Sequence, residues 1–194
     1  MIRILNCKNK NYKKKLVDFL EIRRSRKSLD SAIVSKILND VKKNKVKAVI
    51  KYEKRFSKNK KIYVSKSEIN QTIKKLDPKI KRAIDFAFNR IYKFHSKQKV
   101  HNIFYKDNLK NKIFYKHKPI DSIAIYVPGG NASFPSTVLM NAIPAKIAGV
   151  RRVVMINPKL DGNQSPGVLY AAKKLGIKEI YSIGGAQAIA ALAY

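Results

Sequence analysis

The chain of 194 residues carries 43 lysines and arginines against 12 aspartates and glutamates, which gives a formal net charge of +31. Its hydrophobic content of 45% is normal for a globular protein, and no apolar run reaches the roughly 18 residues that a membrane-spanning helix needs. The single cysteine excludes an internal disulfide, and the basic first residues lack the features of a secretory signal, so we expect a cytoplasmic protein with no membrane partner.

The charge is unevenly distributed along the chain. Residues 1–118 hold 36 Lys and Arg against 9 Asp and Glu, whereas residues 119–194 hold 7 against 3. A strong positive field is typical of proteins that bind nucleic acids. The basic residues are nevertheless spread over several predicted helices, without a zinc-finger, KH or RNP signature. We therefore interpret them as solvated helix faces and expect no specific nucleic-acid partner, while a basic nucleic-acid-binding module remains the alternative.

Residues 1–118 are predicted to be mainly helical. Apolar residues recur at 3.6-residue spacing over 31–43 and 46–56, which indicates two amphipathic helices. Asp30 or Ser31 can cap the first of them by accepting backbone N–H bonds. A shorter helix before them would carry its apolar residues at Leu16, Phe19 and Leu20. The residues that the two main helices are expected to bury are Ile33, Val34, Ile37, Leu38, Val41, Val46, Val49, Ile50 and Phe56.

A further pair of helices follows a short extended segment at 62–64. Ser67 is expected to cap the first helix of this pair. Asp77-Pro78 marks the start of the second, because Asp accepts N–H bonds at the N-cap and Pro fits the first turn. We predict that this helix runs to about Lys99. The residues that it is expected to bury are Ile80, Ala83, Ile84, Ala87, Phe88, Ile91 and Phe94.

A β-hairpin is predicted next, because residues 102–106 and 112–116 each alternate apolar with polar side chains and turn residues lie between them. After the hairpin, positive charge falls and Ala, Gly and Val become frequent. We therefore divide the chain into a basic, mainly helical region with a hairpin, residues 1–118, and a second region, residues 119–194.

The second region is predicted to contain three strands, at 123–127, 153–156 and 179–183, each followed by a helix. The order βαβαβα indicates parallel strands joined by right-handed crossovers, so we expect an α/β fold with an incomplete Rossmann-like sheet. The continuous apolar run at 123–127 predicts a strand that is covered on both faces. Gly149 is expected to end the helix over 136–148, and Pro144 to kink or divide it.

The loops that follow parallel strands lie at one edge of their sheet, where ligands of open α/β folds bind. This places Pro128-Gly129-Gly130, Asn157-Pro158 and Gly184-Gly185 on the same rim. The hydroxyl of Tyr126 could reach this rim, and the amide of Gln187 suits a ribose, a phosphate or a carboxamide. The rim is therefore a candidate dinucleotide site. The alternative is that the glycines serve only tight turns and packing, since neither loop matches GxGxxG or a phosphate loop.

Two sequence blocks resemble the histidinol dehydrogenase family. They are YVPGGNASFPSTVLMNAIPAKIAGV and SIGGAQAIAALAY. The N-terminal portion is similar more weakly, and the resemblance covers roughly residues 30 to 194 in all. The resemblance implies NAD-dependent oxidation of L-histidinol through L-histidinal to L-histidine, a zinc ion, and a homodimer. It also implies that Tyr126 and Gln187 are the cofactor-binding residues.

The resemblance places the zinc ligands, the catalytic Glu-His pair and the substrate residues of the family C-terminal to Tyr194. We therefore predict no catalytic and no metal-binding residue within this chain. His95, His101 and His117 lack metal-ligand spacing and are interpreted as surface or structural histidines. The final helix has no stop signal, so we expect the front portion of a longer enzyme, inactive alone. A degenerate, non-catalytic fragment is a further alternative.

Overall fold

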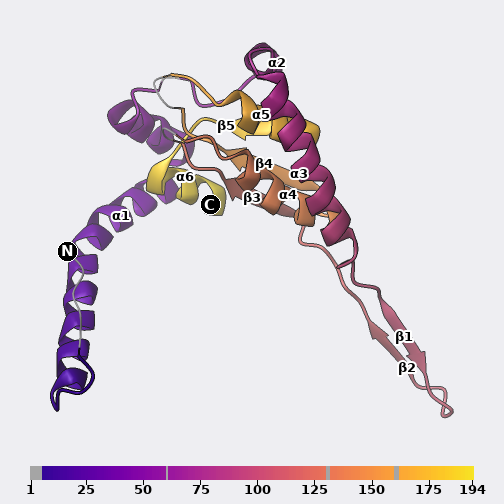
Figure 1. Cartoon of the computed structure of the whole chain (residues 1–194), viewed down its shortest axis with the longest axis horizontal. Helices are drawn as coiled ribbons and strands as arrows, with labels where there is room; N and C mark the ends of the chain where they lie inside the picture. Colours follow the sequence, from indigo (N-terminus) through magenta and orange to yellow (C-terminus); the bar gives the residue numbers. More distant parts are fainter. Residues whose placement is uncertain (1–5, 60, 130–131, 160–161) are drawn as a thin grey trace.

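The computed structural model describes residues 6–59, 61–129, 132–159 and 162–194, without the side chains of residues 22–31. A three-stranded sheet lies at its centre, with helices on both faces (Figure 1). In chain order the described elements are α1 (Tyr12–Phe56), α2 (Lys66–Ile73), α3 (Pro78–Ser96), β1 (Ile103–Lys106), β2 (Lys112–Tyr115), β3 (Ser122–Tyr126), α4 (Pro135–Ala148), β4 (Arg152–Ile156), α5 (Pro166–Lys174), β5 (Glu179–Tyr181) and α6 (Gly185–Ala193).

The central sheet is parallel and has the strand order β3-β4-β5, which confirms the predicted βαβαβα arrangement. Among the described strands, only β4 lies between two neighbours. β3 is an edge strand of the sheet. The expectation that it is covered on both faces is wrong, because Ala124 is exposed. On the opposite edge, the predicted extended segment at 62–64 lies against β5. There the Val64 N–H donates to the Ile180 carbonyl at 3.0 Å, and the Ser182 N–H donates to the Ile62 carbonyl at 2.7 Å.

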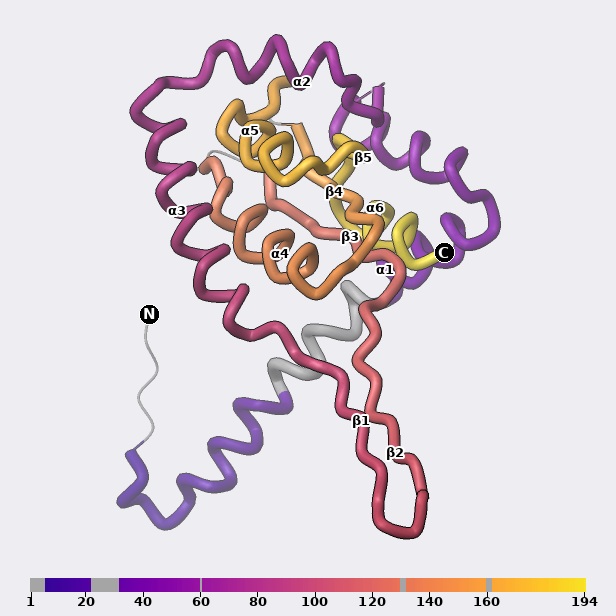
Figure 2. The backbone as a smooth tube through the Cα atoms, turned by 90° about the vertical axis from the view of Figure 1, so that its right-hand side faces the viewer, coloured from indigo at the N-terminus to yellow at the C-terminus, as the bar shows by residue number. Residues whose placement is uncertain are grey.

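The two faces of the sheet are covered by different sets of helices. Figure 2 shows α4 and α5 on one face, with α2 and α3 outside them, and α6 with part of α1 on the other face. Alternation along the strands divides the core in the same way, since Met155 belongs to the first cluster and Ile156 to the second. Both α4 and α5 lie on one face because right-handed crossovers that add strands in one direction stay on one side.

Helix α1 combines the two helices predicted over 31–43 and 46–56. A non-helical residue, Lys45 (φ 51°, ψ −135°), separates them as expected, but the first does not begin at Ser31, because α1 is continuous from Tyr12. The proposed caps, Asp30 and Ser31, have side chains outside those described. The apolar residues of α1 that are buried against α6 and the sheet are Ile37, Val41, Ala48, Val49 and Tyr52.

Several predicted core positions are exposed instead. In α1 these are Ile33, Val34, Val46 and Phe56, and Leu16 and Leu20 are exposed as well. In α3 only Ile84 is buried, and Ile80, Ala83 and Phe94 are exposed. Periodicity identified the helices correctly but overestimated the width of the face that each one buries.

The predicted helix signals are confirmed at two helix ends and wrong at two others. Asp77 caps α3 by accepting the Lys79 N–H at 2.7 Å, and Gly149 ends α4 with φ +93°. Helix α2 is capped by Ser65, which accepts the Glu68 N–H at 3.3 Å, and not by Ser67. Helix α3 ends at Ser96, three residues before the predicted end, and α4 continues through Pro144 without division.

The predicted hairpin is confirmed as the antiparallel pair β1–β2, in which Phe104 lies opposite Phe114. It projects away from the sheet and its helices, and the first part of α1 projects on another side (Figures 1 and 2). All eight residues of the two strands are exposed. Among the described residues, no helix is both long enough and apolar enough to cross a membrane.

Candidate functional site

The loops after β3, β4 and β5 meet at the carboxyl edge of the sheet, as the sequence predicted. They enclose one side of a pocket of about 460 Å³, which we call the rim pocket. Tyr126 and Gln187, the two predicted cofactor-binding residues, both line it, whereas Gly130 lies outside the described residues. The described residues that line the rim pocket are Ile37, Phe56, Ser57, Tyr126, Pro128, Gly129, Pro158, Lys159, Gly184, Gly185, Ala186 and Gln187.

Pro158 lies between the two glycine loops and explains two of the glycines. A Cβ on Gly129 would lie 2.6 Å from the Pro158 carbonyl oxygen, and a Cβ on Gly184 would lie 2.8 Å from Pro158 Cγ. No side chain larger than hydrogen fits at either position without movement of the proline. These two glycines therefore serve close packing of the loops. This agrees with the alternative interpretation of the sequence, in which the glycines serve turns and packing.

Gly185 has a different role, because its φ of +64° is in the left-handed region that favours glycine. This conformation directs the Gly185 N–H to the hydroxyl oxygen of Tyr126, at 3.1 Å. The phenol thus accepts a hydrogen bond from the start of α6. Its own O–H is then the group that Tyr126 can donate to a ligand in the rim pocket.

Gln187 is held from the other side by a carboxylate of α1. Its amide nitrogen donates to Oε1 of Glu53 at 2.9 Å, and the same oxygen accepts the Gly184 N–H at 3.0 Å. Gln187 is 2% exposed and Glu53 is 1% exposed. Because the amide nitrogen faces Glu53, the carbonyl oxygen is the group that Gln187 can turn to a ligand.

Glu53 was missed in the sequence analysis, although the sequence contains a signal for it. It lies four residues after Val49, a position on the buried face of its helix. A carboxylate is rarely buried without partners, so an acidic residue on such a face indicates a hydrogen-bonded role. Which donors it meets depends on residues more than 130 positions away, which no local pattern reveals.

Buried amides fix the loops around the pocket. Asn157 donates to the Val127 carbonyl at 3.2 Å and to the Pro128 carbonyl at 3.4 Å, which joins the loops after β3 and β4. Gln164 in turn donates to the Asn157 carbonyl at 3.1 Å. These side-chain bonds to backbone carbonyls keep the rim in one arrangement without regular secondary structure.

The rim pocket has little spare charge. Among its described lining residues only Lys159 is charged, and it forms an ion pair with Oε1 of Glu68 at 2.8 Å. This lysine is the largest cause of a lowered pKa at Glu68, to which Lys61 also contributes. The charge of Lys159 is therefore already compensated inside the protein.

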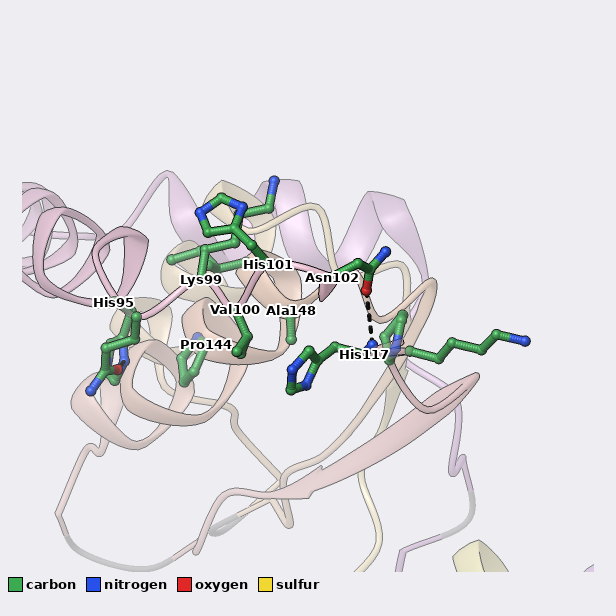
Figure 3. Close-up of a pocket in the computed structure, with 12 residues that line it drawn as sticks. His95, Lys99, Val100, His101, Asn102, His117, Pro144 and Ala148 are labelled. Carbon is green, nitrogen blue, oxygen red and sulfur yellow. Dashed lines mark hydrogen bonds between the residues drawn. The ribbon is translucent and has the colours of Figure 1, made fainter. Parts of the chain in front are cut away.

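A larger cavity of about 600 Å³ lies at the base of the hairpin, and we call it the histidine cleft. All three histidines of the chain line it, but their rings point in different directions (Figure 3). His95 Nδ1 lies 2.6 Å from Gln98 Oε1, and the His117 backbone N–H donates to Asn102 at 2.9 Å. Among the described residues, no group of three or more His, Cys, Asp or Glu could hold a metal ion.

Comparison with known proteins gives one consistent family. A family model described as histidinol dehydrogenase matches residues 22–194. The histidinol dehydrogenase of Pelagibacter ubique is 60% identical over all of this chain and 45% of its own length. That of Rhizobium meliloti is 39% identical over 98% of this chain and 45% of its own length. The chain thus spans about 45% of the length of these curated relatives.

The fold agrees with the same family. The crystal structure of histidinol dehydrogenase from Elizabethkingia anophelis is similar with a TM-score of 0.78 and 39% identity, over 83% of this chain and 38% of that chain. The alternative of a basic nucleic-acid-binding module finds no support among these relatives.

Proposed function

Because the chain belongs to the histidinol dehydrogenase family, we propose that it forms the NAD-binding part of an enzyme that oxidises L-histidinol through L-histidinal to L-histidine. The observation that carries this proposal is the rim pocket, which Tyr126 and Gln187 line together at the carboxyl edge of a parallel sheet. NAD, when bound, would accept a hydride in each oxidation. The chain's own residues would bind and orient it.

The polar groups of the pocket suit this task. Tyr126 offers a hydroxyl proton and Gln187 a carbonyl oxygen, and each is fixed in its role by a partner inside the protein. A ribose hydroxyl pair and a nicotinamide carboxamide each need both a donor and an acceptor. Pro128, Pro158 and Phe56 supply apolar surface for a flat ring.

Zinc does not fit the described part of this chain, because the three histidines diverge and no metal-binding group is formed. We propose that the zinc ligands and the acid–base residues lie in the part of the relatives' sequence that this chain does not cover. Neither histidinol oxidation nor binding of L-histidinal is then expected from the 194 residues alone. We further propose that the whole enzyme is cytoplasmic and forms a homodimer. Light scattering of an enzyme of the relatives' full length would test the dimeric state.

Calorimetric titration of the chain with NAD tests the proposed function. We expect saturable binding in which one NAD binds per chain, and a weaker affinity for Tyr126→Phe, which lacks the hydroxyl. Tyr105→Phe is the matched control, since Tyr105 lies in the exposed hairpin. An affinity that is unchanged in Tyr126→Phe, or absent in the wild-type chain, would contradict the proposal.

A further inference from the structure

Glu53 is the most unusual buried group near the rim pocket. Its side chain comes from α1, is 1% exposed, and places one oxygen within 3.0 Å of Gly184 N and 2.9 Å of Gln187 Nε2. Both donors belong to the first turn of α6 or to the residue that caps it. A carboxylate from the helical region thus fills the position in front of this helix.

That position is normally the place for an anionic ligand. Free N–H groups and the positive end of the helix dipole make a helix N-terminus suitable for phosphate. In α6 the Gly184 N–H donates to Glu53 and the Gly185 N–H donates to Tyr126. A phosphate at this turn would have to displace both hydrogen bonds. It would also meet the negative charge of the Glu53 carboxylate at close range, where repulsion between like charges is strong.

The rest of the rim pocket offers little compensation for a phosphate. Lys159, the charged side chain among its described lining residues, is paired with Glu68, and both groups are partly buried. Asn157 and Gln164 use their amides to join the loops. The groups that remain for a ligand are therefore the uncharged donor of Tyr126 and the uncharged acceptor of Gln187.

We propose that Glu53 is a positioning residue that makes the turn before α6 select the uncharged nucleoside part of the dinucleotide and exclude its pyrophosphate. This inference rests on the proposed function, because it states which part of NAD faces the loop. Glu53 acts through two groups that it holds by hydrogen bonds, the side-chain amide of Gln187 and the backbone N–H of Gly184. The pyrophosphate of NAD then lies away from the start of α6, unlike in folds whose glycine loops bind it.

The test compares a neutral and an anionic probe by NMR of the ¹⁵N-labelled chain at about 0.15 M salt, which weakens binding to surface lysines. Adenosine should shift the backbone amides of Gly184 and Gly185 in the wild-type chain, and inorganic pyrophosphate should not. In Glu53→Gln, which keeps an acceptor but removes the charge, pyrophosphate should bind at these amides more tightly by on the order of fivefold. The ratio of pyrophosphate affinity to adenosine affinity therefore rises.

A purely structural role of Glu53 would change both affinities by the same factor and leave that ratio unchanged, which would overturn the inference. Asp121→Asn is the control, because it changes the net charge by the same amount far from the rim pocket. Asp121 lies at the amino end of β3, where it pairs with Arg151. If Glu53→Gln does not fold, the wild-type chain still decides: pyrophosphate shifts at Gly184 and Gly185 would overturn the inference. Failure of NAD itself to bind, with pyrophosphate still excluded, would instead contradict the proposed function.

Discussion

By size and residue composition, the histidine cleft is the more conspicuous of the two cavities. By the arrangement of polar groups, the rim pocket is the better candidate site. The cleft is larger, about 600 Å³ against about 460 Å³, and it contains every histidine of the chain. Its rings nevertheless point apart, and the residues come from the ends of α3 and α4 and the base of the hairpin (Figure 3). In the rim pocket each candidate group is fixed by a hydrogen bond to a neighbouring loop or helix. Fixed, convergent groups distinguish a candidate site better than volume or residue type.

The largest effect is expected from Gly185→Ala, which attacks the geometry of the rim pocket directly. The added Cβ would lie 2.9 Å from Gln187 Oε1, at a residue with φ +64°. We expect a loss of about 2–3 kcal/mol in the free energy of unfolding, measured with urea, and loss of NAD binding.

Gly176→Ala is the matched control, because Gly176 also has φ +64° but its added Cβ would meet only the end of the Lys146 side chain, at 3.4 Å. It should lose only the conformational part, about 1–2 kcal/mol, and keep its affinity for NAD. Equal NAD affinities in the two variants would show that the turn at Gly185 does not shape the pocket.

A smaller effect is expected from Gln187→Ala, which removes the proposed acceptor. We expect about a tenfold weaker affinity for NAD, corresponding to the loss of roughly one hydrogen bond. Gln98→Ala removes an equivalent amide from the histidine cleft and should leave the affinity unchanged. Calorimetric titration of both variants measures the difference, and a loss in Gln98→Ala equal to that in Gln187→Ala would remove the distinction between the cavities.

Acid should weaken the bond between Glu68 and Lys159 at the wall of the rim pocket. Lys159 lowers the pKa of Glu68 below its ordinary value of 4.5, so this pair contributes stability above that pH, and the contribution is lost as the pH falls through the folded-state pKa. Glu68→Gln should therefore lower the free energy of unfolding at neutral pH by about 1 kcal/mol or less, with the difference disappearing in acid. Urea unfolding of the variant and the wild-type chain, at neutral pH and in acid, measures this difference in the free energy of unfolding. A difference that grows in acid would contradict the stabilising role of the ion pair.

The smallest effect is expected from the histidine cleft. No described histidine lines the rim pocket, so replacing histidines of the cleft should leave the affinity for NAD unchanged. The double variant His101→Gln with His117→Gln should bind NAD as the wild-type chain does, which calorimetric titration measures. A weaker affinity in this variant would mean that the cleft takes part in cofactor binding.

The sequence determined the local features of this protein. The order of helices and strands, the hairpin, the N-cap of α3 at Asp77 and the C-cap of α4 at Gly149 follow from periodicity and capping, which depend only on neighbouring residues. The parallel sheet follows from the order of these elements. The common rim of the three loops was also predictable, because parallel strands end at one edge. The assignment of Tyr126 and Gln187 to NAD and the division of the chain at residue 118 stay predictions.

The tertiary structure alone decided which faces are buried and which polar groups meet. Ile80 and Phe94 have the right spacing for a core but remain exposed, because no element in the described part of the chain covers that side of α3. Pro158 fills the space that Gly129 and Gly184 leave open, and Glu53 reaches Gly184 and Gln187 across more than 130 residues of sequence. Such contacts depend on how distant segments are brought together in space, and a pattern of neighbouring residues contains no record of that.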